Sequence, residues 1–331
     1  MTKAQTILRR CISVVAIYLV LCVAAGITLA EFSVHLPKRT LVTASAQRQR
    51  IWQQFHAPVH DVSLTAADGA TMRAWFIQPN NPNGKAVILL HGITDNRTGI
   101  AGFGDIFLQQ GYSILVPDSR EHGDSGGNIA TYGILERDDV RRWVSWTRER
   151  APGCTYLLGE SMGAAIGLQA TAVTPQLCAV AVESPYATFR KIGFERLGWE
   201  THLGTMFWRT LGRPVVITAI AYTHWRYGIY LPDADPEAAV RQSHVPSLLI
   251  AGTIDKAIPM HNALELKQAC NHCALWIVPG ADHGGASSVA RVEFQRRVLD
   301  WFQRYGGPST ACATQSPARA RASTGMAGNG E

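Results

Sequence analysis

A serine at the centre of a glycine-flanked pentapeptide is the residue in this chain best suited to chemistry. Gly159-Glu160-Ser161-Met162-Gly163 follows a short apolar segment and precedes a segment of helix length. A sharp strand-to-helix turn leaves little room for side chains at its flanks, and it projects the serine hydroxyl from the carboxyl end of a sheet. Because a hydroxyl of high pKa is a poor nucleophile, Ser161 needs a base and an acid that orients the base. An ordinary helix N-cap is the alternative role for Ser161.

Candidates for that acid and base each follow a later apolar segment. They are Asp255, in Gly252-Thr253-Ile254-Asp255, and His283, in Gly280-Ala281-Asp282-His283. If the apolar segments are parallel strands, one edge of the sheet carries Ser161, Asp255 and His283. His283 would take the Ser161 proton as general base, and Asp255 would fix the imidazole tautomer. Asp282 is the competing acid, although its closeness in sequence makes it hard for it to orient the His283 ring.

Two backbone N–H groups are candidates for an oxyanion hole. Met162 follows the serine directly, and Ile93 lies in His91-Gly92-Ile93, just after another apolar segment. Their N–H groups would stabilise the negative oxygen of a tetrahedral intermediate. We expect His91 to have a structural, hydrogen-bonding role rather than to act as a base.

The elements that must position these residues form an alternating pattern. We expect eight strands, at Val59–Thr65, Met72–Ile77, Ala86–Leu90, Ser113–Pro117, Tyr156–Gly159, Ala179–Glu183, Ser247–Gly252 and Ala274–Pro279. From the third strand on, we expect helices to alternate with them, near residues 98–110, 134–150, 161–173, 260–270 and 287–304. Continuous apolar strands separated by helices indicate an α/β fold, with a parallel sheet covered on both faces. Asp68-Gly69 predicts an antiparallel hairpin at one edge.

Residues 185–243 interrupt this alternation, and we interpret them as an inserted helical cap. Ten of the chain's 28 aromatic residues fall between Tyr186 and Tyr230. They either pack a core, line an apolar acyl pocket or face a membrane as a lid. The tail, residues 306–331, is rich in Ala, Ser, Thr, Gly and Arg and is predicted to be disordered.

Residues 1–30 predict a transmembrane anchor. Lys3, Arg9 and Arg10 precede the uncharged run Cys11–Ala30, and twenty helical residues span roughly the 30 Å hydrocarbon core of a bilayer. The basic residues favour a cytoplasmic amino end, which places the body on the periplasmic or extracellular side, although four more basic residues follow the run. A signal cleaved after Ala30, giving a secreted protein, and a buried core helix are the alternatives. We expect residues 31–57 to be a connector, helical in part from 38 to 55.

The positive charge of the chain lies at its ends. The whole chain is +6, whereas residues 51–305 hold 22 basic and 23 acidic residues. A nucleic-acid-binding protein carries its basic surface on the folded domain, so this distribution argues against such a partner.

Four cysteines form two candidate pairs in an exported domain. Cys154 and Cys178 each precede an apolar segment, so parallel neighbouring strands would bring their thiols together, and Cys270 is close to Cys273. We expect one or two disulfides. One alternative is that these thiols are buried and inert. Another is a zinc site at residues 270–273, but a second ligand pair at metal spacing is lacking. We expect no cofactor and no metal.

The ordered set of motifs resembles the α/β-hydrolase superfamily over roughly residues 58–305. It comprises His91-Gly92, Asp118-Ser119-Arg120-Glu121-His122-Gly123-Asp124-Ser125, the serine pentapeptide and the segments ending at Asp255 and His283. It is most similar to the membrane-anchored or exported serine-hydrolase branches. The resemblance implies an eight-stranded sheet, a Ser-Asp-His triad, and a loop pinned by Asp118, Arg120 and His122. Glu160 departs from the family pattern, where many relatives carry His or another residue.

These observations predict a serine hydrolase that acts on a small-molecule or lipid-like acyl substrate. Carboxylic esters or thioesters would be cleaved through an acyl-enzyme, as in esterases and lipases. Peptidase or amidase action by the same triad is one alternative, and a catalytically silent binding protein is another. Epoxide and haloalkane hydrolysis need a carboxylate at position 161 and are disfavoured. The oligomeric state is not predicted.

Overall fold

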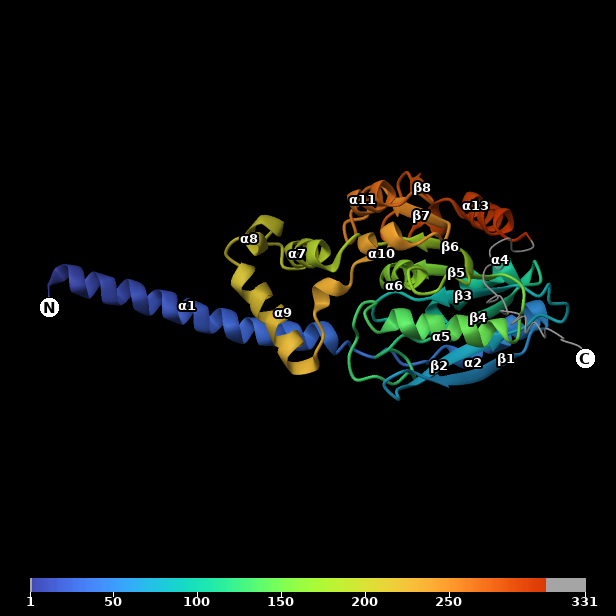
Figure 1. Cartoon of the computed structure of the whole chain (residues 1–331), viewed down its shortest axis with the longest axis horizontal. Coiled ribbons are helices and arrows are strands. Elements are labelled where there is room, and N and C mark those ends of the chain that lie inside the picture. Colours follow the sequence, from blue (N-terminus) through green and yellow to red (C-terminus); the bar gives the residue numbers. More distant parts are fainter. Residues whose placement is uncertain (1, 308–331) are drawn as a thin grey trace, which may run out of the picture.

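The computed structural model describes residues 2–307 and contains one eight-stranded sheet (Figure 1). The strands, in chain order, are β1 (Val59–Thr65), β2 (Thr71–Ile77), β3 (Ala86–Leu90), β4 (Ser113–Pro117), β5 (Thr155–Glu160), β6 (Leu177–Glu183), β7 (Ser247–Gly252) and β8 (Cys273–Val278). Their spatial order is β1-β2-β4-β3-β5-β6-β7-β8. β1 and β2 form the predicted antiparallel hairpin, β2 is antiparallel to β4, and the other neighbours are parallel. The mostly parallel eight-stranded sheet is therefore confirmed.

Helices cover both faces of this sheet, as the alternating pattern predicts. Along β3, Ile88 and Leu90 face one apolar core, and Val87 and Leu89 face the other. The first core also receives α5 (Glu136–Arg148), α6 (Met162–Thr171), α10 (Pro236–Gln242) and α11 (His261–Ala269). The second receives α2 (Ala44–Phe55), α3 (Arg97–Ile100), α4 (Asp105–Leu108) and α13 (Arg291–Arg304). Successive strand residues point to opposite faces, which explains why strands β3 to β7, buried on both faces, are apolar along most of their length.

Two of the predicted helices are broken in the structure. The segment 98–110 consists of α3, a 3-10 turn at Ala101–Gly104 and α4. Three glycines between residues 99 and 104 lower its helix propensity. The segment 287–304 divides into α12 (Ala286–Val289) and α13 at the non-helical residue Ala290. In the connector, the helix begins at Ala44 rather than near residue 38.

The insertion between β6 and β7 contains the predicted helical cap. Its helices α7 (Phe189–Glu200), α8 (Thr205–Arg209) and α9 (Arg213–Tyr227) project away from the sheet (Figure 1). They are followed by a 3-10 turn at Leu231–Asp233. The predicted cap also included α10, but that helix packs against α6 and α11 and so belongs to the body. Of the ten aromatic residues, only Tyr186 is buried, which excludes core packing as their shared role.

The amino-terminal helix α1 (Lys3–Val34) is longer than the predicted run Cys11–Ala30. It is long and apolar enough to cross a membrane, and only 11% of its most apolar stretch is buried. A buried core helix is therefore excluded. Among the described residues, its main packing partner is the cap helix α9 (Figure 1).

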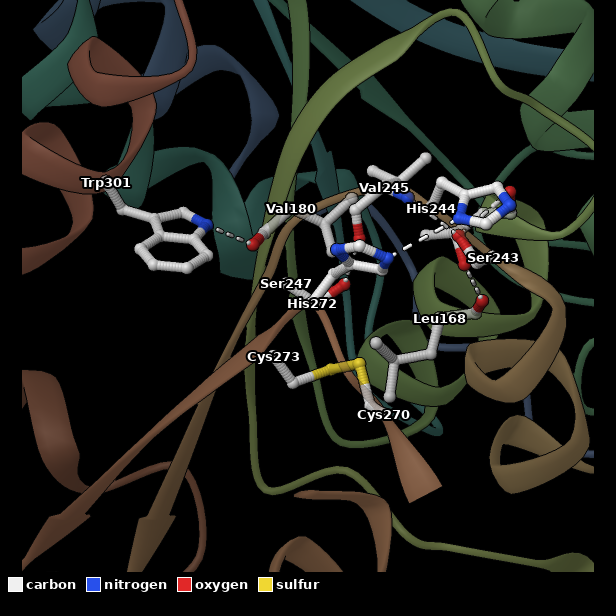
Figure 2. The surroundings of a disulfide bond; sticks show 11 residues. Leu168, Val180, Ser243, His244, Val245, Ser247, Cys270, His272, Cys273 and Trp301 are labelled. Atoms are coloured by element: carbon white, nitrogen blue, oxygen red, sulfur yellow. Dashed lines mark hydrogen bonds between the residues drawn. A yellow bond between two sulfur atoms is a disulfide. The ribbon is translucent and has the colours of Figure 1, made fainter. Parts of the chain in front are cut away.

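Both predicted disulfides are present. Cys154 and Cys178, at the starts of the parallel neighbours β5 and β6, are bonded to each other. Cys270 and Cys273 are also bonded, and Figure 2 shows this disulfide beside the exposed pair His244 and His272. With both sulfurs in a disulfide, the zinc alternative at residues 270–273 is wrong. The predicted disordered tail lies outside the described residues from position 308 on, and so does Cys312.

Candidate active site

Ser161 sits on a sharp turn between β5 and α6. Its backbone is in the positive-φ region, at φ 54°, and the helix begins at Met162 rather than at residue 161. A Cβ on Gly159 would lie 2.5 Å from the Gly163 carbonyl oxygen, and one on Gly163 would lie 2.2 Å from the Leu90 carbonyl oxygen. The two glycines therefore permit the backbone approaches that this turn requires. The hydroxyl of Ser161 makes no bond that caps α6, which argues against the N-cap alternative.

The three side chains predicted to form a triad are hydrogen-bonded in series. The Ser161 hydroxyl lies 2.9 Å from Nε2 of His283, and Nδ1 of His283 lies 2.9 Å from Oδ2 of Asp255. Each residue follows the carboxyl end of a parallel strand, since β5, β7 and β8 share one direction. The competing acid Asp282 has no bond to the ring. The arrangement can pass the Ser161 proton to an imidazole oriented by Asp255.

Asp255 is held as a carboxylate. Its Oδ1 accepts hydrogen bonds from the backbone N–H groups of Ala257 (2.9 Å) and Ile258 (2.8 Å). Burial favours the neutral acid, but the hydrogen bonds from His283 and the backbone outweigh it, so the pKa of Asp255 is lowered. The buried negative charge favours a proton on the Nδ1 atom of His283, which leaves Nε2 free to accept from the serine.

The loop after β3 lies against the serine, where an oxyanion hole is expected. A Cβ built on Gly92 would lie 3.5 Å from the Cβ of Ser161. The N–H of Thr94 donates to Nε2 of His122 at 3.2 Å. Within residues 2–307, neither the N–H of Ile93 nor that of Met162 donates to another protein group. Both groups are therefore available to a ligand oxygen.

His91 and His122 are structural in this site. Nδ1 of His91 donates to the Gly92 carbonyl oxygen at 2.7 Å, and Nε2 accepts from the Ser119 N–H at 3.0 Å. Burial lowers the pKa of His91, and burial together with the neighbouring His91 lowers that of His122 to about 4. Both rings are therefore neutral near pH 7, and they tie the loop after β3 to the loop after β4.

Asp118 and Arg120 hold the loop after β4, as the family resemblance implies. Asp118 accepts from the backbone N–H groups of Arg97 (2.7 Å) and Asp124 (2.9 Å). Arg120 pairs with Asp139 and, at 2.6 Å, with Asp68 in the hairpin turn. Neither Asp118 nor Arg120 hydrogen-bonds to Ser161, Asp255 or His283, so this cluster supports the site through the loop.

Sequence reasoning missed a second buried acid, Glu183, at the end of β6. Its backbone carbonyl accepts from the Ser161 N–H at 2.9 Å, and its Oε1 accepts from the Ala286 N–H at 2.7 Å, three residues after His283. Burial and the nearby Glu160 raise the pKa of Glu183 to about 7, although the bond from Ala286 opposes this. No motif marks Glu183; only the register of β5 and β6, which pairs it with Glu160, reveals it.

Glu160 lies under the loop that carries His283. A Cβ on Gly284 would come within 2.6 Å of its Oε1. Burial raises the pKa of Glu160, and the nearby His283 opposes the shift. Among the described residues no lysine or arginine pairs with this side chain, so its role is not that of a surface ion pair.

A cavity of about 420 Å³ opens between the cap and the loop that follows Asp255. Its lining includes the cationic side chains of Arg209 and Lys256, together with Glu195, Trp199 and His261. The lining is mixed in polarity, so this cavity does not match the apolar acyl pocket that is one alternative for the aromatic cap. Among residues 2–307, no group of three or more His, Cys, Asp or Glu side chains is arranged to hold a metal ion.

Two family models match successive parts of the chain. One, described as serine aminopeptidase, S33, matches residues 81–212 and includes Ser161. The other, described as the prolyl oligopeptidase family, matches residues 220–309 and includes Asp255 and His283.

Similar proteins and structures span most of the chain. An uncharacterized protein of Bacillus subtilis is 26% identical over 253 residues, which cover 72% of this chain and 77% of that protein. An uncharacterized protein of Mycobacterium tuberculosis is 23% identical over 301 residues, 90% of this chain and 96% of that one. An esterase of Pyrococcus furiosus has a TM-score of 0.63 at 23% identity, covering 77% of this chain and 94% of its own. A hydrolase from a Penicillium species has a TM-score of 0.59 at 18% identity, covering 75% of this chain and 99% of its own.

Proposed function

Because the chain belongs to the α/β-hydrolase superfamily, we propose that it is a serine hydrolase that cleaves carboxylic esters or thioesters. The observation that carries this proposal is the series of two 2.9 Å hydrogen bonds from Ser161 through His283 to Asp255. The family models and the hydrolase neighbours support hydrolase activity in general. The ester or thioester substrate is our inference.

In the proposed reaction the Ser161 oxygen attacks the substrate's carbonyl carbon while Nε2 of His283 accepts the hydroxyl proton. The resulting oxyanion would accept hydrogen bonds from the N–H groups of Ile93 and Met162. The imidazolium then gives its proton to the leaving alcohol or thiol as the bond to the carbonyl carbon breaks. A water molecule, deprotonated by the same imidazole, releases the acid from the acyl-enzyme and restores Ser161.

We further propose that α1 anchors the enzyme in a membrane, with the catalytic domain on the extracytoplasmic side. Support comes from its bonding to the rest of the protein. The Tyr18 hydroxyl donates to the Leu211 carbonyl, and a Cβ on Gly26 would lie 2.5 Å from the Cβ of Thr218. A signal cleaved at Ala30 would remove most of a helix that packs against the folded domain. The two disulfides also suit an extracytoplasmic compartment.

Amide hydrolysis is the second candidate, because both matching family models carry peptidase descriptions. The same triad can attack either carbonyl, and what differs is the protonation of a poorer, amine leaving group. The comparison of ester and anilide substrates distinguishes the two reactions.

The test compares p-nitrophenyl esters of increasing acyl length with peptide anilides, using the full-length protein in detergent. We expect ester hydrolysis to dominate and Ser161→Ala to lower kcat by at least about 10,000-fold, as losses of such nucleophiles do. Ser145→Ala, which removes an exposed hydroxyl on α5, is the matched control and should keep full activity. Faster anilide cleavage would favour the amidase. Full ester hydrolysis by Ser161→Ala would refute the proposal.

A further inference from the structure

The cap helix α9 lies along the carboxyl-terminal half of the proposed anchor α1 (Figure 1). The buried residues of α1 recur every fourth position, at Cys22, Gly26, Ala30 and Val34. A Cβ on Gly26 would lie 2.5 Å from the Cβ of Thr218 and 2.7 Å from the Val215 carbonyl oxygen. Small residues that let two helix backbones approach this closely are typical of helix pairs inside membranes.

Polar bonds fix the two helices at both ends of this contact. Near the body, the Glu31 carboxylate accepts from the hydroxyls of Tyr222 (2.6 Å) and Tyr227 (2.8 Å). At the far end, the hydroxyl of Tyr18 donates to the carbonyl of Leu211, in the turn between α8 and α9. Because Leu211 is bonded to Tyr18 and Tyr227 is bonded to Glu31, α9 runs in the same direction as α1.

This contact sets the height of the cap relative to a bilayer. If Cys11–Ala30 crosses the hydrocarbon core, Gly26 lies about 6 Å inside its outer boundary, at 1.5 Å per residue. Val215 and Thr218 contact Gly26 and share its depth. The turn at Leu211 reaches further in. The start of α9 and the turn before it therefore overlap the outer leaflet.

The surface of this segment suits lipid. Large apolar side chains are exposed along it: Leu203, Met206, Leu211, Ile217 and Trp225, of which Trp225 is 79% exposed. Residues 201–230 hold three arginines and no acidic residue. Exposed apolar side chains with arginines and no acids are the composition of membrane-surface elements. Arg209 lies 3.9 Å from Glu195 in the cavity lining. The long side chains of the other two arginines, Arg213 and Arg226, can extend from the apolar region to lipid phosphates.

Three of the four N–H groups in the turn between α8 and α9, residues 210 to 213, are hydrogen-bonded within the described residues, and that of Leu211 is not. The N–H groups of Thr210, Gly212 and Arg213 donate to carbonyls at Met206, Phe207 and Thr210. The Leu211 carbonyl is bonded by Tyr18. Irregular backbone is tolerated at membrane depth where its polar groups are paired within the protein, as most of those in this turn are.

We propose that residues 201–227, the end of the cap that holds α8 and α9, lie in the outer leaflet of the bilayer beside α1. The occupant of this apolar surface is lipid, because the surface is continuous with the exposed apolar face of α1. The inference rests on the proposed anchor but not on the chemistry proposed for Ser161. It places the cap where an acyl substrate can leave the bilayer for the active site.

The test is quenching of tryptophan fluorescence by brominated lipid in full-length protein reconstituted into phosphatidylcholine vesicles. Ile217→Trp places an extra tryptophan on the exposed face of α9, where Ile217 is 54% exposed. Val292→Trp is the control on α13 in the body, at an apolar position that is even more exposed (80%). We expect dibromo-lipid vesicles to abolish most of the emission that Ile217→Trp adds and to leave that of Val292→Trp unchanged.

Equal quenching of the two added tryptophans, or failure of the full-length protein to float with the vesicles, would overturn the proposal. Far-UV circular dichroism of each variant checks that it is folded. None of these measurements uses hydrolysis, so an inactive protein whose cap is quenched would refute the proposed reaction and leave the membrane inference standing. An active protein whose cap is not quenched would refute the membrane inference and leave the proposed reaction standing.

Discussion

The Ser161 hydroxyl and the Asp255 carboxylate bind opposite nitrogens of the His283 imidazole, so the ring has one productive tautomer and little freedom to turn. Behind it, Glu183 bonds both sides of the site: its carbonyl accepts from the N–H of Ser161, and its carboxyl accepts from the loop that carries His283. The second carboxyl oxygen of Glu183 is buried without a partner among the described residues. A buried carboxyl in this setting favours its protonated form.

The protonation of Glu183 makes stability depend on pH. Its folded pKa of about 7 lies above the ordinary value of 4.5, so its contribution is fully present below pH 4.5 and is lost as pH rises to about 7. We expect the free energy of unfolding of the wild type, relative to Glu183→Gln, to fall by roughly 2 to 3 kcal/mol between pH 5 and pH 8. Denaturant titrations at both pH values measure this change.

The exposed Glu149 provides the control for this prediction, because its side chain is 72% exposed. Glu149→Gln should follow the pH dependence of the wild type. A Glu183→Gln protein that also follows the wild type from pH 5 to pH 8 would mean that Glu183 is ionised in the fold throughout that range.

At the residue scale, what the sequence predicted was the set of groups that have a local signature. Ser161 is marked by its flanking glycines, and Asp255 and His283 by their places after apolar strands. Glu183 has no such signature. Its importance comes from burial and from the pairing of β6 with β5, which are properties of the assembled sheet. The same holds for the contact of Glu160 with Gly284.

At the scale of elements, strand positions were predictable because strands β3 to β7 are buried on both faces and are therefore apolar along most of their length. Four of the eight strands, β1, β3, β4 and β7, begin and end at the predicted residues. β2 and β6 end at the predicted residue but begin one or two residues earlier. Helices were less predictable where glycines interrupt them, as between residues 97 and 108. The cap could be located from its aromatic residues, but its attachment to α1 depends on tertiary contacts that no local pattern encodes.

The disulfides give a prediction that belongs to the elements. Cys154–Cys178 closes a loop with a sequence separation of 24, and Cys270–Cys273 one of 3. On the chain-entropy relation, the first stabilises the fold by about 3.5 kcal/mol and the second by about 2 kcal/mol. We expect Cys154→Ala/Cys178→Ala to lower the free energy of unfolding more than Cys270→Ala/Cys273→Ala, measured by guanidinium titration of full-length protein in detergent. The reverse order would contradict this.

At the scale of the whole molecule, the α/β-hydrolase fold, the cap and the proposed anchor α1 form one unit, in which the cap helix α9 packs against α1. β6 ends beside Ser161, the cap follows it, and β7 then leads to Asp255. The cap is thus inserted between two strands that carry the site. The chain therefore leaves the candidate site at the end of β6, forms the helix α9 that packs against α1, and returns to the candidate site at the end of β7.

The most direct measurement for the whole account is to react the full-length protein with a fluorophosphonate probe and to locate the adduct by mass spectrometry of its peptides. Phosphonylation requires a serine oxygen activated by a base, as in the proposed acylation. We predict one adduct per chain, on Ser161, formed much more slowly in His283→Ala. A folded protein that takes up no probe, or that carries it on a different serine, would contradict the account.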